Sequence, residues 1–120
     1  EKRSKNPTRV IIAGGREFTD YNRLCWFMDQ WVLDNDMGPD NTDFISGEAK
    51  DADILGKKWA LSRGYKVVLF PAQWAGYIRN KAMADEASHL VAWWNETSPG
   101  TGNMILIANA AKLKVHIERY

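Results

Sequence analysis

The sequence has little cysteine, no long apolar run and almost no net charge, and each shortage excludes a class of protein. Cys25 is the one cysteine in 120 residues, which excludes an internal disulfide framework and favours a reducing compartment. No apolar run approaches the roughly 20 residues that span a bilayer, and no signal-peptide pattern precedes the first expected strand. We therefore expect a cytoplasmic protein with no membrane partner.

The charge is distributed unevenly along the chain. The formal net charge is +1, and Lys2, Arg3 and Lys5 against Glu1 give the first seven residues +2, which leaves −1 for the rest. A nearly neutral body argues against general binding to duplex nucleic acid, which needs many phosphate contacts from a basic face. We predict a flexible basic arm over residues 1–8 and one domain over residues 9–120.

In that domain, short strand-like runs alternate with segments whose apolar residues recur at the spacing of a helix. Residues 9–13 form a mostly β-branched run without alternation, which is typical of a strand buried on both faces. Similar strands are expected at 43–46, 66–70, 89–93 and 113–117, and helices at about 20–33, 52–63, 79–87 and 101–111, the first capped by Thr19 or Asp20. Strands separated by helices predict a single three-layer α/β domain with a mainly parallel five-stranded sheet and helices on both faces.

Three glycine-containing turns follow expected strands. They are Gly14-Gly15-Arg16, Ser46-Gly47 and Pro99-Gly100-Thr101. A helix that starts just after a strand presents unpaired N–H groups and a positive dipole end to an anion, and ligands of parallel α/β folds gather beyond the carboxyl ends of the strands. Each turn also has an ordinary interpretation, because Gly14-Gly15 can be a strand exit and Ser46 and Thr101 can be helix caps.

Charged side chains near these turns have two interpretations each. Arg16 offers a bidentate fork for phosphate or carboxylate, and Asp53 either orients a ribose or complements a helix dipole. The pair Arg79-Asn80 either clamps a ligand or leaves Arg79 to an ion pair with Asp85 or Glu86.

Several common sites are absent from the sequence. Neither G-x-G-x-x-G nor G-x-x-x-x-G-K-[ST] occurs, which argues against a conventional dinucleotide or P-loop site. His89 and His116 lack metal-ligand spacing, and no Ser-His-Asp arrangement can be specified. We expect no metal and no resident cofactor.

Five short motifs in order carry a family resemblance. They read RVIIAGGREF at 9–18, SGEAKDAD at 46–53, FPAQW at 70–74, RNKAM at 79–83 and GTGNMI at 100–105. This set resembles the YspA-type branch of the SLOG superfamily over residues 9–117. The resemblance implies a Rossmann-like domain that binds nucleotides or nucleotide-derived molecules, and relatives include both sensors and enzymes.

The resemblance assigns residues to the family's motifs one by one. Gly14, Gly15 and Arg16 match the first loop; the central motif is matched by Ser46, Gly47, Ala49, Ala52 and Asp53, and the later motifs by Arg79, Asn80, Gly100 and Thr101. The full set of candidate ligand-binding residues is Gly14, Gly15, Arg16, Phe18, Ser46, Gly47, Lys50, Asp53, Arg79, Asn80, Gly100, Thr101 and Asn103.

The sequence departs from the family pattern in its charges. The central motif usually reads Ser-Gly-Gly-Ala-Arg-Gly-Ala-Asp, whereas Glu48, Lys50 and Asp51 stand here at three of its positions. Two added carboxylates would repel a polyanion unless they face away or hold ribose hydroxyls. Similar phosphoribohydrolases carry Pro-Gly-Gly-x-Gly-Thr-x-x-Glu, whose carboxylate is missing after Gly100-Thr101, so Glu48 is the candidate catalytic carboxylate.

These observations favour a binding protein over an enzyme. We expect a sensor or sequestering protein for a nucleotide or nucleotide-derived molecule of the ADP-ribose, NAD or cyclic-nucleotide class, with Phe18 or Trp94 stacking on the base. The alternative is a phosphoribohydrolase-like enzyme that cleaves an N-glycosidic or phosphoester bond, and a single-stranded DNA module is less favoured. We also expect a homo-oligomer, because helix faces with Trp26, Trp31 and Trp59 exceed what one small core can hide.

Overall fold

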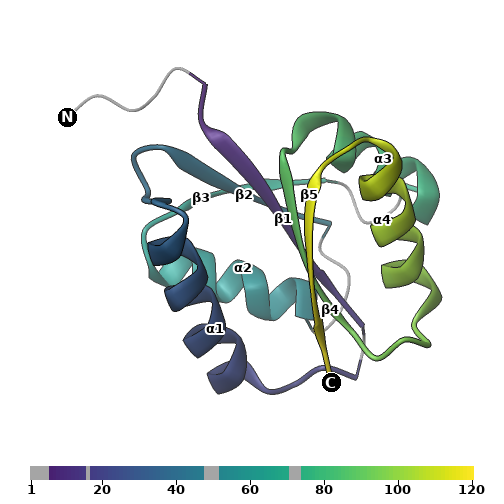
Figure 1. Cartoon of the computed structure of the whole chain (residues 1–120), viewed down its shortest axis with the longest axis horizontal. Helices are drawn as coiled ribbons and strands as arrows, with labels where there is room; N and C mark the ends of the chain where they lie inside the picture. Colours follow the sequence, from purple (N-terminus) through teal and green to yellow (C-terminus); the bar gives the residue numbers. More distant parts are fainter. Residues whose placement is uncertain (1–5, 16, 48–51, 71–73) are drawn as a thin grey trace.

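The chain folds as alternating strands and helices (Figure 1). The computed structural model describes residues 6–15, 17–47, 52–70 and 74–120, without the side chains of Ala52 and Asp53. Within these residues the elements are β1 (Thr8–Gly14), α1 (Tyr21–Asp34), β2 (Thr42–Ser46), α2 (Ala52–Ser62), β3 (Lys66–Leu69), α3 (Gly76–Glu86), β4 (His89–Trp94), α4 (Pro99–Ala110) and β5 (Lys114–Arg119).

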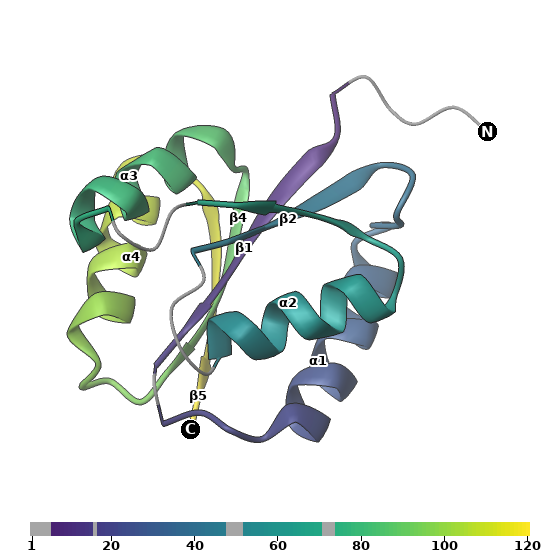
Figure 2. The ribbon, with the colours of Figure 1, turned by 180° about the vertical axis from the view of Figure 1, so that it is seen from behind.

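The strands form one five-stranded sheet in the order β3-β2-β1-β4-β5, and every pair of neighbours is parallel. The helices α1 and α2 cover one face of the sheet, and α3 and α4 cover the other (Figures 1 and 2). The predicted Rossmann-like domain is therefore confirmed. The order changes direction between β1 and β4, and the sequence alone did not locate this point.

β1 shows why an apolar run without alternation belongs in the middle of such a sheet. Val10 and Ile12 pack in the core beneath α1 and α2, while Ile11 and Ala13 pack in the core beneath α3 and α4. All four side chains are buried. Because each face is covered, each large apolar side chain contributes about 1.5 to 3 kcal/mol of burial free energy.

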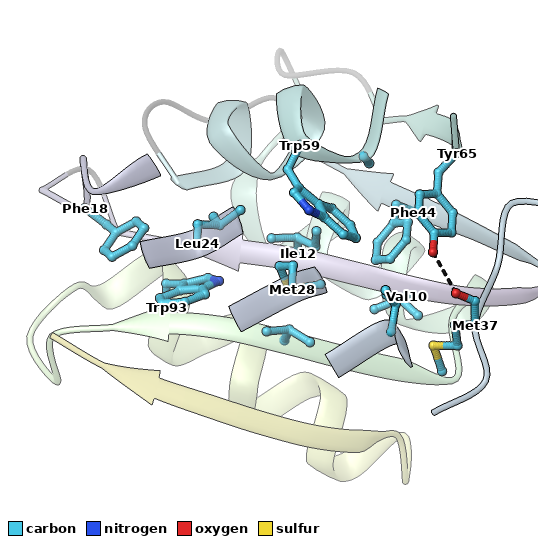
Figure 3. Packing of buried hydrophobic residues seen from close by; sticks show 13 residues of the cluster. Val10, Ile12, Phe18, Leu24, Met28, Met37, Phe44, Trp59, Tyr65 and Trp93 are labelled. Atoms are coloured by element: carbon cyan, nitrogen blue, oxygen red, sulfur yellow. Dashed lines mark hydrogen bonds between the residues drawn. The ribbon is translucent and has the colours of Figure 1, made fainter. Parts of the chain in front are cut away.

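The core beneath α1 and α2 is rich in aromatic rings (Figure 3). Phe44 meets the edges of Trp59 and Tyr65 at centroid distances of 5.2 and 4.9 Å. Trp59 donates its indole N–H to Asp29 at 2.8 Å, and the Tyr65 hydroxyl donates to the carbonyl of Met37 at 2.6 Å. The polar atoms that these rings bring into the core therefore keep hydrogen-bond partners.

Helix boundaries follow the expected capping chemistry with two shifts. Asp20 is the cap of α1, where its carboxylate accepts a hydrogen bond from the Arg23 amide at 3.0 Å. α3 begins at Gly76 instead of Arg79, and α4 begins at Pro99 instead of Thr101. Proline suits the first position of a helix because its missing N–H has no partner there anyway, and this explains the earlier start of α4.

The tryptophans expected to support self-association differ in exposure. Trp59 is fully buried, Trp31 is half-buried, and Trp26 is 75% exposed. An uncovered aromatic surface on these helices is therefore contributed mainly by Trp26, and self-association stays a prediction. Among the described helices, none has both the length and the apolar character that crossing a membrane requires.

A substitution at Gly56 can test how closely α2 packs on the sheet. A Cβ at this position would lie 2.5 Å from Cγ2 and 2.9 Å from Cβ of Ile12, which the central strand holds in place. We expect Gly56→Ala to lower the free energy of unfolding by about 1 to 2 kcal/mol, because overpacking outweighs the gain in helix propensity. Gly76→Ala is the matched control, since its Cβ would meet nothing within 4 Å. Equal denaturant midpoints for the two variants would contradict this packing.

The lowered pKa of His89 makes the stability of the folded protein depend on pH in the mildly acidic range. Burial, with a smaller contribution from Lys114, lowers the pKa of His89 below its ordinary value of 6.5. The unfolded chain therefore binds a proton more readily than the folded chain, and stability falls as the pH drops below about 6.5 toward the folded pKa. In thermal melts at pH 7.5 and pH 5.5, we expect a smaller loss of Tm for His89→Gln than for the parent protein. If His89→Gln and the parent protein lose the same Tm between pH 7.5 and pH 5.5, His89 is not the cause of the loss of stability at low pH.

Candidate functional site

A cavity of about 750 Å³ opens at the carboxyl ends of β1 and β4, where the strand order changes direction. This is the place where parallel α/β sheets usually bind ligands, and the volume falls in the usual range for small-molecule sites. The cavity is lined by Ala13, Gly14, Glu17, Gly76, Tyr77, Arg79, Asn80, Met83, Asn95, Thr97, Ser98, Pro99, Gly100, Thr101, Asn103 and Met104.

The first turn of α4 forms one wall of the cavity. Its first helical hydrogen bond runs from the Gly102 amide to the carbonyl of Ser98 at 3.0 Å. Within the described part of the chain, the amides of Gly100 and Thr101 bond to no acceptor, and the Ser98 side chain does not cap the helix. Unlike α1, which Asp20 caps, α4 therefore presents amides and its dipole to the cavity.

Asn95 shapes the loop that leads into α4. Its side-chain oxygen accepts hydrogen bonds from the amides of Thr97 at 3.0 Å and Ser98 at 2.9 Å. Its amide nitrogen donates to Glu17 at 3.3 Å and so links this loop to the loop after β1. Sequence reasoning missed both Asn95 and Glu17. An Asn three residues before a Ser-Pro helix start is the signature of an Asx turn and could have identified Asn95.

Gly15 allows the two loops to approach each other. Its amide donates to the carbonyl of Trp93 at 3.1 Å, which continues the pairing of β1 and β4 beyond the strand. A Cβ on Gly15 would lie 3.3 Å from the Cβ of Ser98 and would collide with the hydroxyl of Tyr120. Gly14 lines the cavity, whereas Gly15 is not among the lining residues. A role of this turn in ligand binding stays a prediction.

Asn80 joins α3 to α4 at the base of the cavity. It is buried, and its side-chain nitrogen donates to the side-chain oxygen of Asn103 at 3.0 Å and to the carbonyl of Gly100 at 3.4 Å. The structure thus brings together three candidate residues from two separate motifs. These bonds hold the first turn of α4 in place.

Arg79 lies between the cavity and the end of β2. It lines the cavity, and its Nε lies 3.0 Å from the position that a Cβ on Gly47 would occupy. The alternative partners proposed for it from sequence are taken by other cations, since Asp85 pairs with Lys81 at 2.5 Å and Glu86 pairs with Arg9.

Comparison with known proteins places the chain in a family. A model of the YspA, cpYpsA-related SLOG family matches residues 8–77. The chain belongs to this SLOG family. No curated protein and no solved structure matches the chain. Membership suggests a nucleotide-related role in ligand binding or processing. The matched range of this SLOG domain includes the loop after β1 and the start of α3, whereas α4 lies outside it.

Ser46 and Gly47 of the SLOG domain support the site from behind. Ser46 is buried at the end of β2, and its carbonyl accepts a hydrogen bond from the Phe70 amide at 3.0 Å. Gly47 is also buried, against Arg79 and Met83. Neither Ser46 nor Gly47 lines the cavity; Gly47 lies behind Arg79, which does.

The two aromatic residues expected to stack on a base are not among the residues that line the cavity. Phe18 is only 2% exposed and stacks on Trp93 at 4.7 Å, in the core beneath α1 and α2. That core lies on the face of the sheet opposite α3 and α4. Trp94 packs against Gly102 and donates its indole N–H to the carbonyl of Ser98 at 3.0 Å. Phe18 is buried and Trp94 is half-buried, and neither residue lines the cavity.

Four candidate residues cannot be placed at the cavity. Arg16, Glu48 and Lys50 lie outside the described residues. Asp53 belongs to the first turn of α2, and its side chain is not among those described. Their roles in binding or catalysis stay predictions.

A double-mutant cycle can measure the link between α3 and α4. We expect Asn80→Ala to lower the free energy of unfolding by about 1 to 3 kcal/mol, because it removes the two hydrogen bonds that the buried Asn80 side chain donates to α4. Asn103→Ala removes the side-chain partner of the shorter bond. If the 3.0 Å bond carries the effect, urea titrations will give a coupling energy of about 0.5 to 1.5 kcal/mol between the two changes. Additive effects would show that the bond contributes nothing.

Proposed function

We propose that this SLOG domain binds a nucleotide or nucleotide-derived small molecule, as a sensor or sequestering protein, with a phosphate at the N-terminus of α4. The observation that carries the proposal is the cavity at the change in strand order, into which the unbonded amides of Gly100 and Thr101 open. Family membership supports the same ligand class. Backbone amides at a helix start bind phosphate through hydrogen bonds and through the helix dipole.

The charged side chains of the cavity suit the rest of such a ligand. Arg79 supplies positive charge to offset a phosphate. Glu17 supplies a carboxylate for ribose hydroxyls, and its hydrogen bond from Asn95 keeps it near the loop before α4. Glu17 can therefore also accept the hydrogen bonds from ribose hydroxyls that were expected to go to Asp53 or Glu48.

Gly100→Asp separates binding from stability. A Cβ on Gly100 would meet nothing within 4 Å, so the substitution fits without collision. A carboxylate in the first turn stabilises a helix by about 0.3 to 1 kcal/mol but repels a phosphate placed there. In isothermal titration calorimetry with AMP, we expect Gly100→Asp to bind at least 10-fold more weakly while its Tm stays equal or rises.

Gly100→Asn is the matched control, because it has the shape of aspartate without the charge, and it should keep most of the affinity for AMP. Equal affinities of the parent and Gly100→Asp proteins would refute a phosphate at this helix end. ADP-ribose and NAD should respond to the same substitution in the same direction. The three ligands therefore test the class as well as the position.

Hydrolysis of the ligand is the second candidate function, and the position of Glu17 favours it. A carboxylate in the cavity can act as a general base for water attacking C1′ of the ribose, and the glycosidic bond to the base breaks as the base takes up a proton. The products are a free base and ribose 5-phosphate. Mass spectrometry of AMP after incubation separates the two functions: intact AMP supports binding alone, and adenine supports hydrolysis. Glu17→Gln should abolish any such turnover.

A further inference from the structure

Tyr77 is an exposed aromatic ring on the lining of the cavity. It lies in the first turn of α3, and 66% of its surface is exposed. Within the described part of the chain, no other aromatic ring contacts it. Core burial therefore does not explain its position. This differs from Phe44, Trp59 and Trp93, which are buried and packed against other rings.

The residues around Tyr77 connect it to the proposed phosphate site. Tyr77, Asn80 and Met83 all line the cavity and follow each other at spacings of three along α3, so they share one side of the helix. Asn80 in turn bonds to the carbonyl of Gly100 in α4. Three residues of helix rise by about 4.5 Å, so Tyr77 lies about one turn from the residue that contacts the phosphate-binding end.

The neighbouring aromatic residues do not offer the same surface. Trp74 is 44% exposed, but its ring is T-shaped to that of Phe70, with 6.3 Å between the ring centroids, and it does not line the cavity. Phe18 is buried in the opposite core, and the half-buried Trp94 donates its indole N–H to the Ser98 carbonyl; neither residue lines the cavity. Of the described lining residues, Tyr77 is the one with an aromatic ring.

We propose that Tyr77 is the platform on which the base of the ligand stacks, so that the cavity selects nucleotides over sugar phosphates. This inference rests on the proposed function, since it assumes a phosphate at the N-terminus of α4. A ligand with its phosphate there and its base one ribose away extends along the face of α3 toward Tyr77. Because every base has a π-face, stacking favours the presence of a base more than its identity.

AMP and ribose 5-phosphate provide the test, because they differ only in the base. By isothermal titration calorimetry, the parent protein should bind AMP at least 10-fold more tightly than ribose 5-phosphate. Tyr77→Ser should weaken AMP binding roughly 10-fold, the usual effect of losing one stacking ring, and leave ribose 5-phosphate unchanged. Tyr77→Phe should retain AMP affinity because the ring face remains.

Trp26→Ser is the matched control for loss of an exposed helical aromatic ring. Trp26 is 75% exposed on α1, which covers the opposite face of the sheet, so its loss should leave both affinities unchanged. Circular dichroism and Tm show whether each variant is folded.

The outcomes distinguish the two proposals. If Tyr77→Ser binds AMP as tightly as the parent while Gly100→Asp binds it more weakly, the stacking role is wrong and the phosphate site stands. Equal losses for AMP and ribose 5-phosphate in a folded Tyr77→Ser protein would also overturn the stacking role. If the parent protein binds neither ligand, the proposed function fails and the inference fails with it.

Discussion

The parallel pairing of β1 with β4 is the constraint on which the site depends. Five residue pairs run from Val10 opposite His89 to Gly14 opposite Trp93, and the Gly15 amide adds a further hydrogen bond to Trp93. The loops after both strands therefore leave the sheet at the same edge. Since β2 and β3 lie on one side of β1 and β5 lies beyond β4, the helices on the two sides diverge here and leave room for the cavity. A side chain on Gly15 would force these loops apart.

The N-termini of α1 and α4, which cover opposite faces of the sheet, are capped differently. α1 has the carboxylate of Asp20 on its first turn, and this satisfies an amide that would otherwise lack a partner. α4 starts with Pro99 and receives no side-chain cap within the described residues. It is instead held from the side, by Asn80 and by the burial of Thr101 and Met104. A helix end left open but rigidly supported is the arrangement that a binding site requires, because the donors need no rearrangement when a ligand arrives.

The aromatic residues divide into those that fold the domain and those that remain outside it. Phe44, Trp59 and Tyr65 pack against each other beneath α1 and α2, and Phe18 packs with Trp93. Burial of so much ring area stabilises a domain of this size, and it also removes these rings from ligand contact. Tyr77 and Trp26 stand apart from the core, on opposite faces of the sheet. The ring at the cavity is thus found by exposure and position, which composition does not reveal.

The order and type of the elements, and the turns at which we look for a ligand, follow from local patterns in the amino-acid sequence. An apolar run such as residues 10–13 is buried completely only in a strand that is covered on both faces, and the helical spacing of Leu24, Met28 and Val32 is a local property of the chain. Which of these turns lie close together depends on the packing of the folded domain. It brought Gly14, Asn80 and Gly100 to one cavity, moved Ser46 and Gly47 behind Arg79, and enclosed Phe18 in the opposite core. The reason is physical: strand order and helix packing are set by contacts between residues far apart in the chain, and local patterns carry no information about distance across the sheet.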